Sequence, residues 1–195
     1  RLVKAGGEAP SPAYTINSAE FITIASTGDA LDFGDLTEKR RRAMAIGSPT
    51  RMLICGGYSS PANKDTIDFF TFSTTGNAAD FGNLSEAKNT GGGSSNAVTG
   101  FVSGDSDVDR ITIATLGSAL DNGADLTSTR TSFGSTSSKT RAVFCGGYSP
   151  ASPYPGSNVM DYQQFASDGN FIDFGDLASN MQNNAGISNG HGGLG

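Results

Sequence analysis

The sequence is poor in the residues that most chemical sites require. Among 195 residues it has one histidine, two cysteines and no tryptophan. Charged residues make up only 16% of the chain, and the net charge is −6 at pH 7. No apolar run approaches the roughly 20 residues that a membrane-spanning helix needs. Since no such run occurs, we expect no insertion into a membrane. Because the balance of charge is acidic, we also expect no nucleic-acid partner.

The chain also shows no secretory signal, and it opens with Arg1 rather than Met. We interpret this start as trimming, which would have removed any targeting information. Its one basic cluster, at residues 39–42, is interpreted as a solvated loop between strands. A local contact with an anion is the alternative explanation for these four residues.

One unit is repeated four times along the chain. A stretch resembling Phe-Gly-Asp-Leu occurs at 33–36, 81–84, 123–126 and 174–177. Its Asp or Asn anchors are 48, 42 and 51 residues apart, and a Gly-containing turn precedes each stretch. A period of this length, made of short β-like runs and turns, is typical of propeller blades.

Each unit contains four candidate strands and no helical pattern. A β-branched and aromatic run comes first, at 21–24, 67–72, 108–113 and 160–165. The anchor strand follows it across a turn. A weakly apolar strand comes next, around 42–46 or 130–133, then a turn at 47–50 or 135–138. The last strand ends in Gly-Gly, at 56–57 and 146–147.

We therefore predict an all-β fold, a β-propeller of about four four-stranded blades that form a single domain over residues 1–195. The blade units are placed roughly at 8–57, 58–104, 105–147 and 148–195. Residues 1–7 align with 51–57 and 141–147, so this N-terminal strand is expected to complete the last blade and close the ring. Such a closure removes the open strand edges that promote aggregation.

Stability is expected to come from apolar faces stacked between neighbouring blades. The residues predicted for this core are Ile22, Ile24, Phe33, Leu53, Phe70, Phe72, Phe81, Val102, Ile111, Ile113, Val143, Phe165 and Phe174. Cys55 and Cys145 occupy the same place in two units that would lie across the ring, too far apart for a disulfide. Neither has a second Cys or His at ligand spacing, so we expect small buried thiols and no metal or other cofactor.

The order of these features resembles the kelch repeat. The matching positions are Gly56-Gly57, Gly146-Gly147, Asp161-Tyr162, Arg42 and Arg130. The chain departs from kelch at the usual tryptophan, where Phe33, Phe81 and Phe174 stand, and it has Ser103-Gly104 and Lys88 in the second unit. The sequence of residues 22–36 is most similar to kelch-like repeats in virion proteins of marine tailed phages. This likeness covers nearly the whole chain.

The candidate chemical residues are explained by the repeat or lack partners. His191 lies in a Gly-rich stretch, whereas a Ser-His-Asp or Cys-His device needs a rigidly held base. The carboxylates recur at matching positions, which indicates turn capping: Asp32, Asp35, Asp80, Asp125, Asp173 and Asp176. The segment 105–109 lacks the Gly and Glu of an EF-hand loop, so at most a weak cation site is expected there. Residues 91–93 are predicted to be a flexible or tightly bent connection, and we expect no enzyme.

The better functional candidates are the loops that break the repeat after the Gly-Gly strands. Tyrosine with Ser, Pro and Asn on a rigid scaffold is typical of recognition surfaces. Simple solvated connections are an equally good explanation of the same composition. The candidate binding residues are Tyr14, Tyr58, Asn63, Tyr148 and Tyr154.

The resemblance implies a non-enzymatic structural or host-attachment protein of a phage tail, nozzle or fibre. It would reside in the virion after assembly in the host cytoplasm, and its partners would be other virion proteins or a host surface glycan or protein. A homo-oligomer is compatible with this role. Two alternatives remain: a lectin-like propeller that binds carbohydrate, and an intracellular kelch-type scaffold for protein interactions.

Overall fold

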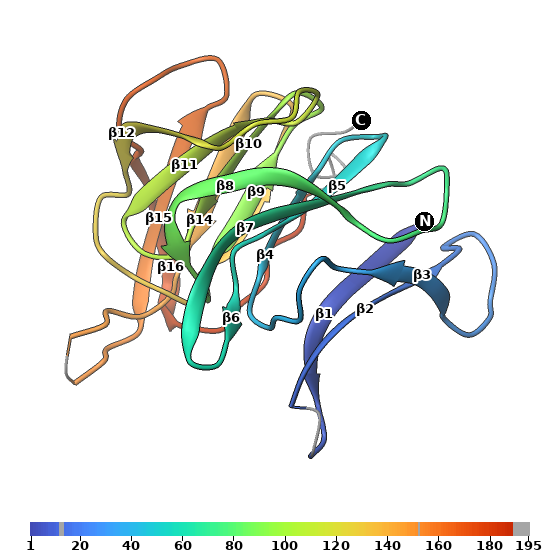
Figure 1. The fold of residues 1–195 in the computed structure, drawn as a ribbon. Helices are drawn as coiled ribbons and strands as arrows, with labels where there is room; N and C mark the ends of the chain where they lie inside the picture. The colour runs from blue at the N-terminus through green and yellow to red at the C-terminus, as the bar shows by residue number, and fades with distance from the viewer. Residues whose placement is uncertain (12–13, 152, 189–195) are drawn as a thin grey trace.

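The structure is a computed structural model that describes residues 1–11, 14–151 and 153–188. Sixteen strands and their turns make up these ranges, which contain no helix and therefore none that could cross a membrane. The strands form four antiparallel sheets that follow one another in chain order (Figure 1). The predicted all-β class is confirmed.

The first sheet has three strands and the other three sheets have four or five. The first sheet consists of β1 (Leu2–Ala9), β2 (Tyr14–Ile22) and β3 (Leu31–Asp35). The second consists of β4 (Met44–Gly47), β5 (Arg51–Cys55), β7 (Ala62–Thr71) and β8 (Ala79–Lys88), with the short β6 (Tyr58–Ser59) paired to β7. The third consists of β9 (Gly92–Ser95), β10 (Thr99–Ser103), β11 (Asp107–Thr112) and β12 (Leu120–Asp125). The fourth consists of β13 (Gly134–Ser137), β14 (Arg141–Cys145), β15 (Ser157–Gln164) and β16 (Ile172–Met181).

The sheets are offset from the sequence units. Each of the last three sheets begins with a short inner strand and the strand ending near Gly-Gly, which belong to the end of one unit. Its remaining strands belong to the start of the next unit. Consecutive units are therefore joined by the hydrogen bonds of a shared sheet.

The arrangement is consistent with a β-propeller, but the described residues do not form a closed ring. Figure 1 shows the blue first sheet and the orange fourth sheet on opposite sides of the view. The predicted closing strand is β1, which pairs with β2. Within the described ranges its other edge has no strand partner, and the first sheet lacks an inner strand.

Two predicted local features are wrong because the inner strands tolerate unusually small residues. Residues 91–93, expected to be a connection, lead into β9 and form part of it. A Cβ on Gly93 would lie 2.5 Å from the Ala45 carbonyl oxygen, so only glycine allows β9 to approach β4 this closely. In the next unit the inner strand is β13 rather than 130–133, and the segment 135–138 that was expected to turn is mostly strand.

Each of three apolar clusters lies between two consecutive sheets. The first joins Phe33 and Leu36 to Met52, Ile54 and Phe70, with the rings of Phe33 and Phe70 edge to face at 5.4 Å. The second and third clusters repeat this packing between the following sheets. Burial of apolar faces between sheets is therefore the main source of stability, as predicted.

The predicted core is largely correct. Eight of its members are buried: Phe33, Leu53, Phe70, Phe81, Val102, Ile111, Ile113 and Phe165. Ile22, Phe72 and Val143 are partly buried. The prediction of burial is wrong for Ile24 and Phe174, which have 69% and 49% of their surface exposed. Ile24 lies beyond the end of β2, and Phe174 belongs to none of the three apolar clusters that the described residues form.

A buried ion pair accompanies each apolar cluster. In every case the cation lies four residues after the Leu of the anchor stretch, and the aspartate lies in the central strand of the next sheet. The three pairs are Arg40–Asp68 at 3.0 Å, Lys88–Asp109 at 3.3 Å and Arg130–Asp161 at 2.6 Å. At most 1% of any of these six side chains is exposed.

Hydrogen bonds compensate part of the desolvation of these buried charges, although Nε of Arg40 and Nε of Arg130 find no partner among the described residues. The Thr37 hydroxyl donates to Asp68 at 2.7 Å, and the Thr127 hydroxyl donates to Asp161 at 2.6 Å. Arg40 also donates to the Ile54 carbonyl oxygen at 3.0 Å. Since burying an uncompensated charge is costly, such partners are required for these pairs to exist inside the protein.

The basic cluster at 39–42 is therefore more than a solvated loop. Arg40 is fully buried in the first ion pair, and it is Arg40 rather than Arg42 that matches Lys88 and Arg130 in the repeat. Arg41 is partly buried and forms an ion pair with Glu8. Arg42 alone stays exposed among the three arginines.

Replacing Asp161 by Asn leaves the guanidinium of Arg130 buried without a counter-charge. We expect this change to lower the free energy of unfolding by about 3–5 kcal/mol, measured by urea denaturation. Asp65→Asn, at an exposed position of β7, is the control and should change stability by less than about 0.5 kcal/mol. Equal effects of the two changes would show that the buried pair is not needed for stability.

Candidate functional site

The inner strands and the segment after β16 line one cavity, which we call the channel. A cavity of about 280 Å³ is lined by residues 43–45, 91–93, 133–135 and 184–186, which occupy equivalent places in the four units. The last segment lies beside β13, where the Asn184 side chain accepts a hydrogen bond from Gly134 N at 3.0 Å. The channel is therefore lined by three strands and a fourth segment that follows β16.

Backbone hydrogen bonds link these four segments at one end of the channel. Thr90 N donates to Arg42 O at 3.0 Å, Ser132 N to Thr90 O at 2.7 Å, and Asn183 N to Ser132 O at 2.8 Å. All four residues have positive φ angles, between 54° and 58°. This conformation is uncommon for residues other than glycine, so the hydrogen-bonded series is needed to hold it.

The same four residues line the mouth of the channel. Tyr148, Tyr154 and Gln182 complete the wall of a cavity of about 650 Å³ at this end. The rings of Tyr148 and Tyr154 lie edge to face, with centroids 6.4 Å apart. The lining contains one cation, Arg42, and no carboxylate.

Of the predicted binding residues, the structure brings Tyr148 and Tyr154 together at this mouth. Tyr154 is 59% exposed, and Tyr148 is partly buried where its backbone pairs with Thr131. Tyr14, at the start of β2, is 62% exposed and belongs to the first sheet. It is not part of the mouth.

Tyr58 and Asn63 lie next to the mouth and are tied to it by side-chain contacts. The guanidinium of Arg41 lies over the Tyr58 ring, 5.2 Å from its centroid. The Asn63 side chain accepts a hydrogen bond from Asn89, which in turn accepts one from the Thr90 hydroxyl. Tyr58 and Asn63 therefore support the rim through Arg41 and Asn89.

The recurring carboxylates serve the scaffold. The Asp80 and Asp173 side chains accept hydrogen bonds from the backbone two residues later, at 3.0 and 2.8 Å, as predicted for turn capping. In the segment 105–109, Asp107 and Asp109 hold Lys88. Desolvation alone would lower the pKa of Lys88, but hydrogen bonds and attraction from these carboxylates raise it overall. Within the described ranges, no three His, Cys, Asp or Glu residues come close enough to bind a metal ion.

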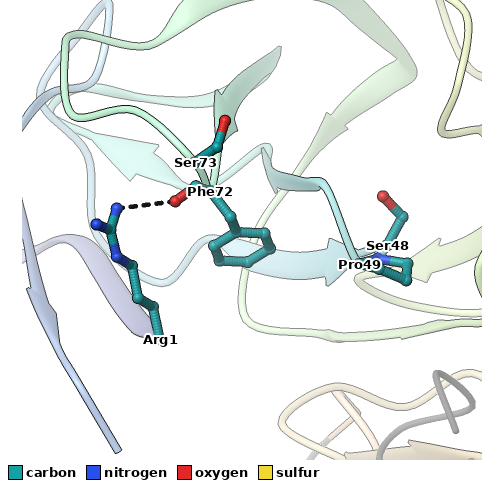
Figure 2. A pocket seen from close by; sticks show the side chains of 5 residues that line it. All are labelled: Arg1, Ser48, Pro49, Phe72 and Ser73. Carbon is teal, nitrogen blue, oxygen red and sulfur yellow. Dashed lines mark hydrogen bonds between the residues drawn. The ribbon is translucent and has the colours of Figure 1, made fainter.

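Another cavity, of about 550 Å³, lies between the first and second sheets and is lined by Arg1, Ser48, Pro49, Phe72 and Ser73 (Figure 2). Its cation is already engaged, because Arg1 donates to the Phe72 carbonyl oxygen at 2.9 Å. The same guanidinium lies 4.8 Å from the centroid of the Phe21 ring. This cavity offers one partly buried apolar ring and no cluster of free polar side chains, so we prefer the channel mouth as the candidate site.

The mouth is suited to binding rather than to acid-base chemistry. Two aromatic rings offer faces on which a sugar or an extended peptide could stack. Arg42, Thr90, Ser132 and Asn183 add a cation, hydroxyls and an amide around one opening. His191, the one histidine, lies outside the described residues.

Comparison with protein-family models and with curated proteins gives no significant match to this chain. Function is therefore inferred from the residues themselves. The loop composition predicted Tyr148 and Tyr154, but it missed Thr90, Ser132, Asn183 and Gln182. A signal for three of these residues was available, since Thr90, Ser132 and Asn183 each lie six residues after the anchor Leu, as Arg42 does.

The two thiols beside the channel should differ in reactivity. Burial raises the pKa of Cys55, which is inaccessible, and raises that of Cys145, which is only partly buried. In single-cysteine variants at pH 8, we expect the folded Cys145 protein to react at least about tenfold faster with a maleimide than the Cys55 protein. Equal rates in the folded state would contradict the burial of Cys55, and equal rates in urea provide the control.

Proposed function

We propose that this chain is a non-enzymatic propeller module of a phage virion, acting in a tail, nozzle or fibre as a structural or host-attachment component. The virion assignment rests on the resemblance of residues 22–36 and their repeats to kelch-like virion proteins. The observation that carries the binding role is the channel mouth, where side chains from all four repeat units meet the two tyrosines of the longest irregular loop.

The distribution of charged residues supports a scaffold with one recognition face. The recurring aspartates in the central strands are consumed by ion pairs between sheets. Tyr148 and Tyr154, from the loop after β14, lie at the mouth instead. A rigid scaffold with variable loops at one end is a common way to present a binding surface. Its partner would be another virion protein or a host surface glycan or protein.

The scaffold we propose is a closed propeller of four kelch-like blades, in which residues 185–188 pair with β1. A series of side-chain hydrogen bonds supports this placement. Ser95 donates to Gly47 O at 2.9 Å, Ser137 to Ser95 O at 2.7 Å, and Ser188 to Ser137 O at 2.6 Å. Ser188 thus makes the contact that the end of an inner strand makes in the preceding units. In the structure, however, Ile187 is 94% exposed.

The free edge of β1 faces a suitable space. A groove of about 220 Å³ runs between residues 3–7 of β1 and residues 40–45, which include part of β4. In the second sheet the corresponding edge, that of β5, is covered by β4. An inner strand laid into this groove would give the first sheet the four strands of its neighbours.

Ile187 tests this closure because it is equivalent to Ile46, which is 5% exposed. If 185–188 pairs with β1 in solution, Ile187→Ala should lower the free energy of unfolding by roughly 2–4 kcal/mol, measured by urea denaturation. Leu116→Ala, at a turn residue that is 60% exposed, is the control. A loss no larger than the control's would exclude the pairing.

The binding role is tested with a glycan array and with host-cell envelopes, both probed with the folded chain. We expect saturable binding that weakens at least about tenfold in Tyr148→Ala and Tyr154→Ala, because stacking on these rings would be lost. Tyr14→Ala, away from the mouth, should bind as the parent does. Loss of binding in Tyr14→Ala alone would place the site on the first sheet, and equal binding by all three variants would exclude the mouth.

A lectin-like propeller is the second candidate, and the tyrosine pair beside Arg42 is the observation that favours it. Binding to glycans on the array would support both roles. Binding to cell envelopes without any glycan signal would favour a protein receptor and would count against the lectin.

A further inference from the structure

The face of the fourth sheet that points away from the third sheet resembles a junction without its partner. Two of its apolar residues are exposed, Phe174 by 49% and Met181 by 38%. Phe174 is equivalent to Phe33 and Phe81, each of which is buried against the next sheet. An exposed apolar cluster of this kind marks an interaction surface.

The residues that would form an ion pair on this face have been replaced. Four residues after the anchor Leu stand Arg40, Lys88 and Arg130 in the first three units, but Met181 in the fourth. The equivalence is structural as well, because the second Gly of the Gly-Gly pair donates to this residue's carbonyl oxygen in three sheets. The three bonds are Gly7 N to Arg40 O, Gly57 N to Lys88 O and Gly147 N to Met181 O, at 2.9, 2.8 and 2.9 Å. Ala178 stands where Thr37 and Thr127 donate to the aspartates.

A matching change occurs on the outward face of the first sheet. Glu20 stands where Asp68, Asp109 and Asp161 stand in the other sheets, and it is exposed. Directly opposite Glu20 on β1 is Lys4, at the position that Ile54 and Val102 fill elsewhere. The first sheet therefore carries its own cation beside its carboxylate, so it needs none from a preceding sheet.

The changes on the two sheets are complementary. The fourth sheet offers no cation, so a sheet that packs on it must not bury a carboxylate that lacks a counter-charge. We propose that the exposed face of the fourth sheet packs on the first sheet of the same chain. Unlike the other three junctions, this junction has no buried ion pair between its two sheets. Phe174 and Met181 would pack against Leu2 and Ile22, with Lys4 and Glu20 at the rim. Leu2 is 48% exposed in the structure.

The two sheets retain the hydrogen-bonding groups that such a junction needs. At the first two junctions a glycine N–H in the next sheet's turn donates to the anchor Phe: Gly76 N to Phe33 O at 2.7 Å and Gly117 N to Phe81 O at 2.9 Å. The turn of the first sheet has Gly28 at this place. Its neighbour Asp29 matches Asn77, which accepts a hydrogen bond from Asp35 N at 3.0 Å.

The choice of the same chain rather than a second copy follows from the channel. Residues 184–186 already line one cavity together with 43–45, the segment that leads into β4. All four inner positions are thus occupied within one chain, which leaves room for one junction between the fourth and first sheets. The inference rests on the closed ring proposed above, but it concerns the packing of faces rather than the pairing of strands.

Three glycines provide the test, because they share a conformation and differ in their surroundings. Gly34, Gly82 and Gly175 have φ angles of 140°, 144° and 128°. A Cβ on Gly34 would lie 2.3 Å from Gly76 O, and one on Gly82 would lie 2.6 Å from Gly117 O. A Cβ on Gly175 would have its nearest neighbour at 4.0 Å, the Met160 methyl group.

We therefore compare the unfolding midpoints of Gly82→Ala and Gly175→Ala in the full chain. Strain from positive φ is common to both, so a difference between them reports the neighbouring sheet. If the fourth junction forms, Gly175→Ala should lower the midpoint as much as Gly82→Ala does. A clearly smaller shift for Gly175→Ala would overturn the proposal.

A double-mutant cycle supplies a second measurement. Phe174→Ala and Ile22→Ala should shift the midpoint by less together than the sum of their separate shifts, as expected for residues in contact. Phe81→Ala with Ile111→Ala is the positive control, because both residues belong to one buried cluster. Additive shifts for Phe174 and Ile22 would contradict the contact.

Separate measurements show whether the partner sheet belongs to the same chain and whether the closing strand pairs with β1. If the coupling grows with protein concentration and sedimentation shows a dimer, the junction joins two copies and the same-chain proposal is wrong. If Ile187→Ala is neutral while Gly175→Ala is as damaging as Gly82→Ala, the faces pack without the closing strand. The reverse result would leave the strand closure standing and remove the packed junction.

Discussion

The buried contact between a cation and an aspartate at each junction is the constraint on which the rest of the structure depends. It fixes the distance and register between consecutive sheets, because the cation must reach a carboxylate in the next central strand while threonine hydroxyls complete the coordination. The apolar clusters then pack around this fixed point. Buried ion pairs often contribute little net stability, so their value here lies in specifying one arrangement of sheets over others.

The same constraint limits which charged groups a chemical site could use. The three aspartates and three cations of the junctions are held between the sheets with almost no exposure. Side chains that these junctions leave free line the channel mouth, among them Tyr154 and the residues with left-handed backbone. A propeller-like scaffold of this kind is able to vary its binding surface without disturbing the contacts that hold it together.

Much of the fold could be predicted because the repeat places apolar residues and turns at fixed intervals. The strands around Phe33, Phe70 and Phe81 were recognised this way, and so was the all-β class. Burial of Arg40 could not be recognised, since three adjacent arginines look alike until the position after the anchor Leu is counted. The strand β9 was missed because its glycines signal flexibility in isolation and close approach only when β4 is beside them. The mouth was half predicted, because Tyr148 and Tyr154 stand out by composition whereas Thr90 and Ser132 matter through their backbone.

The offset between sheets and sequence units has a consequence for how such chains change over time. Each unit ends by supplying two strands to a sheet that the next unit completes, so a duplicated or deleted unit carries a matching half-sheet at both of its ends. Gene-level gain or loss of one such unit would therefore recreate familiar contacts on either side instead of leaving an unmatched edge. Blade number can drift by recombination in a scaffold of this kind, while the chemistry of every internal junction is inherited unchanged.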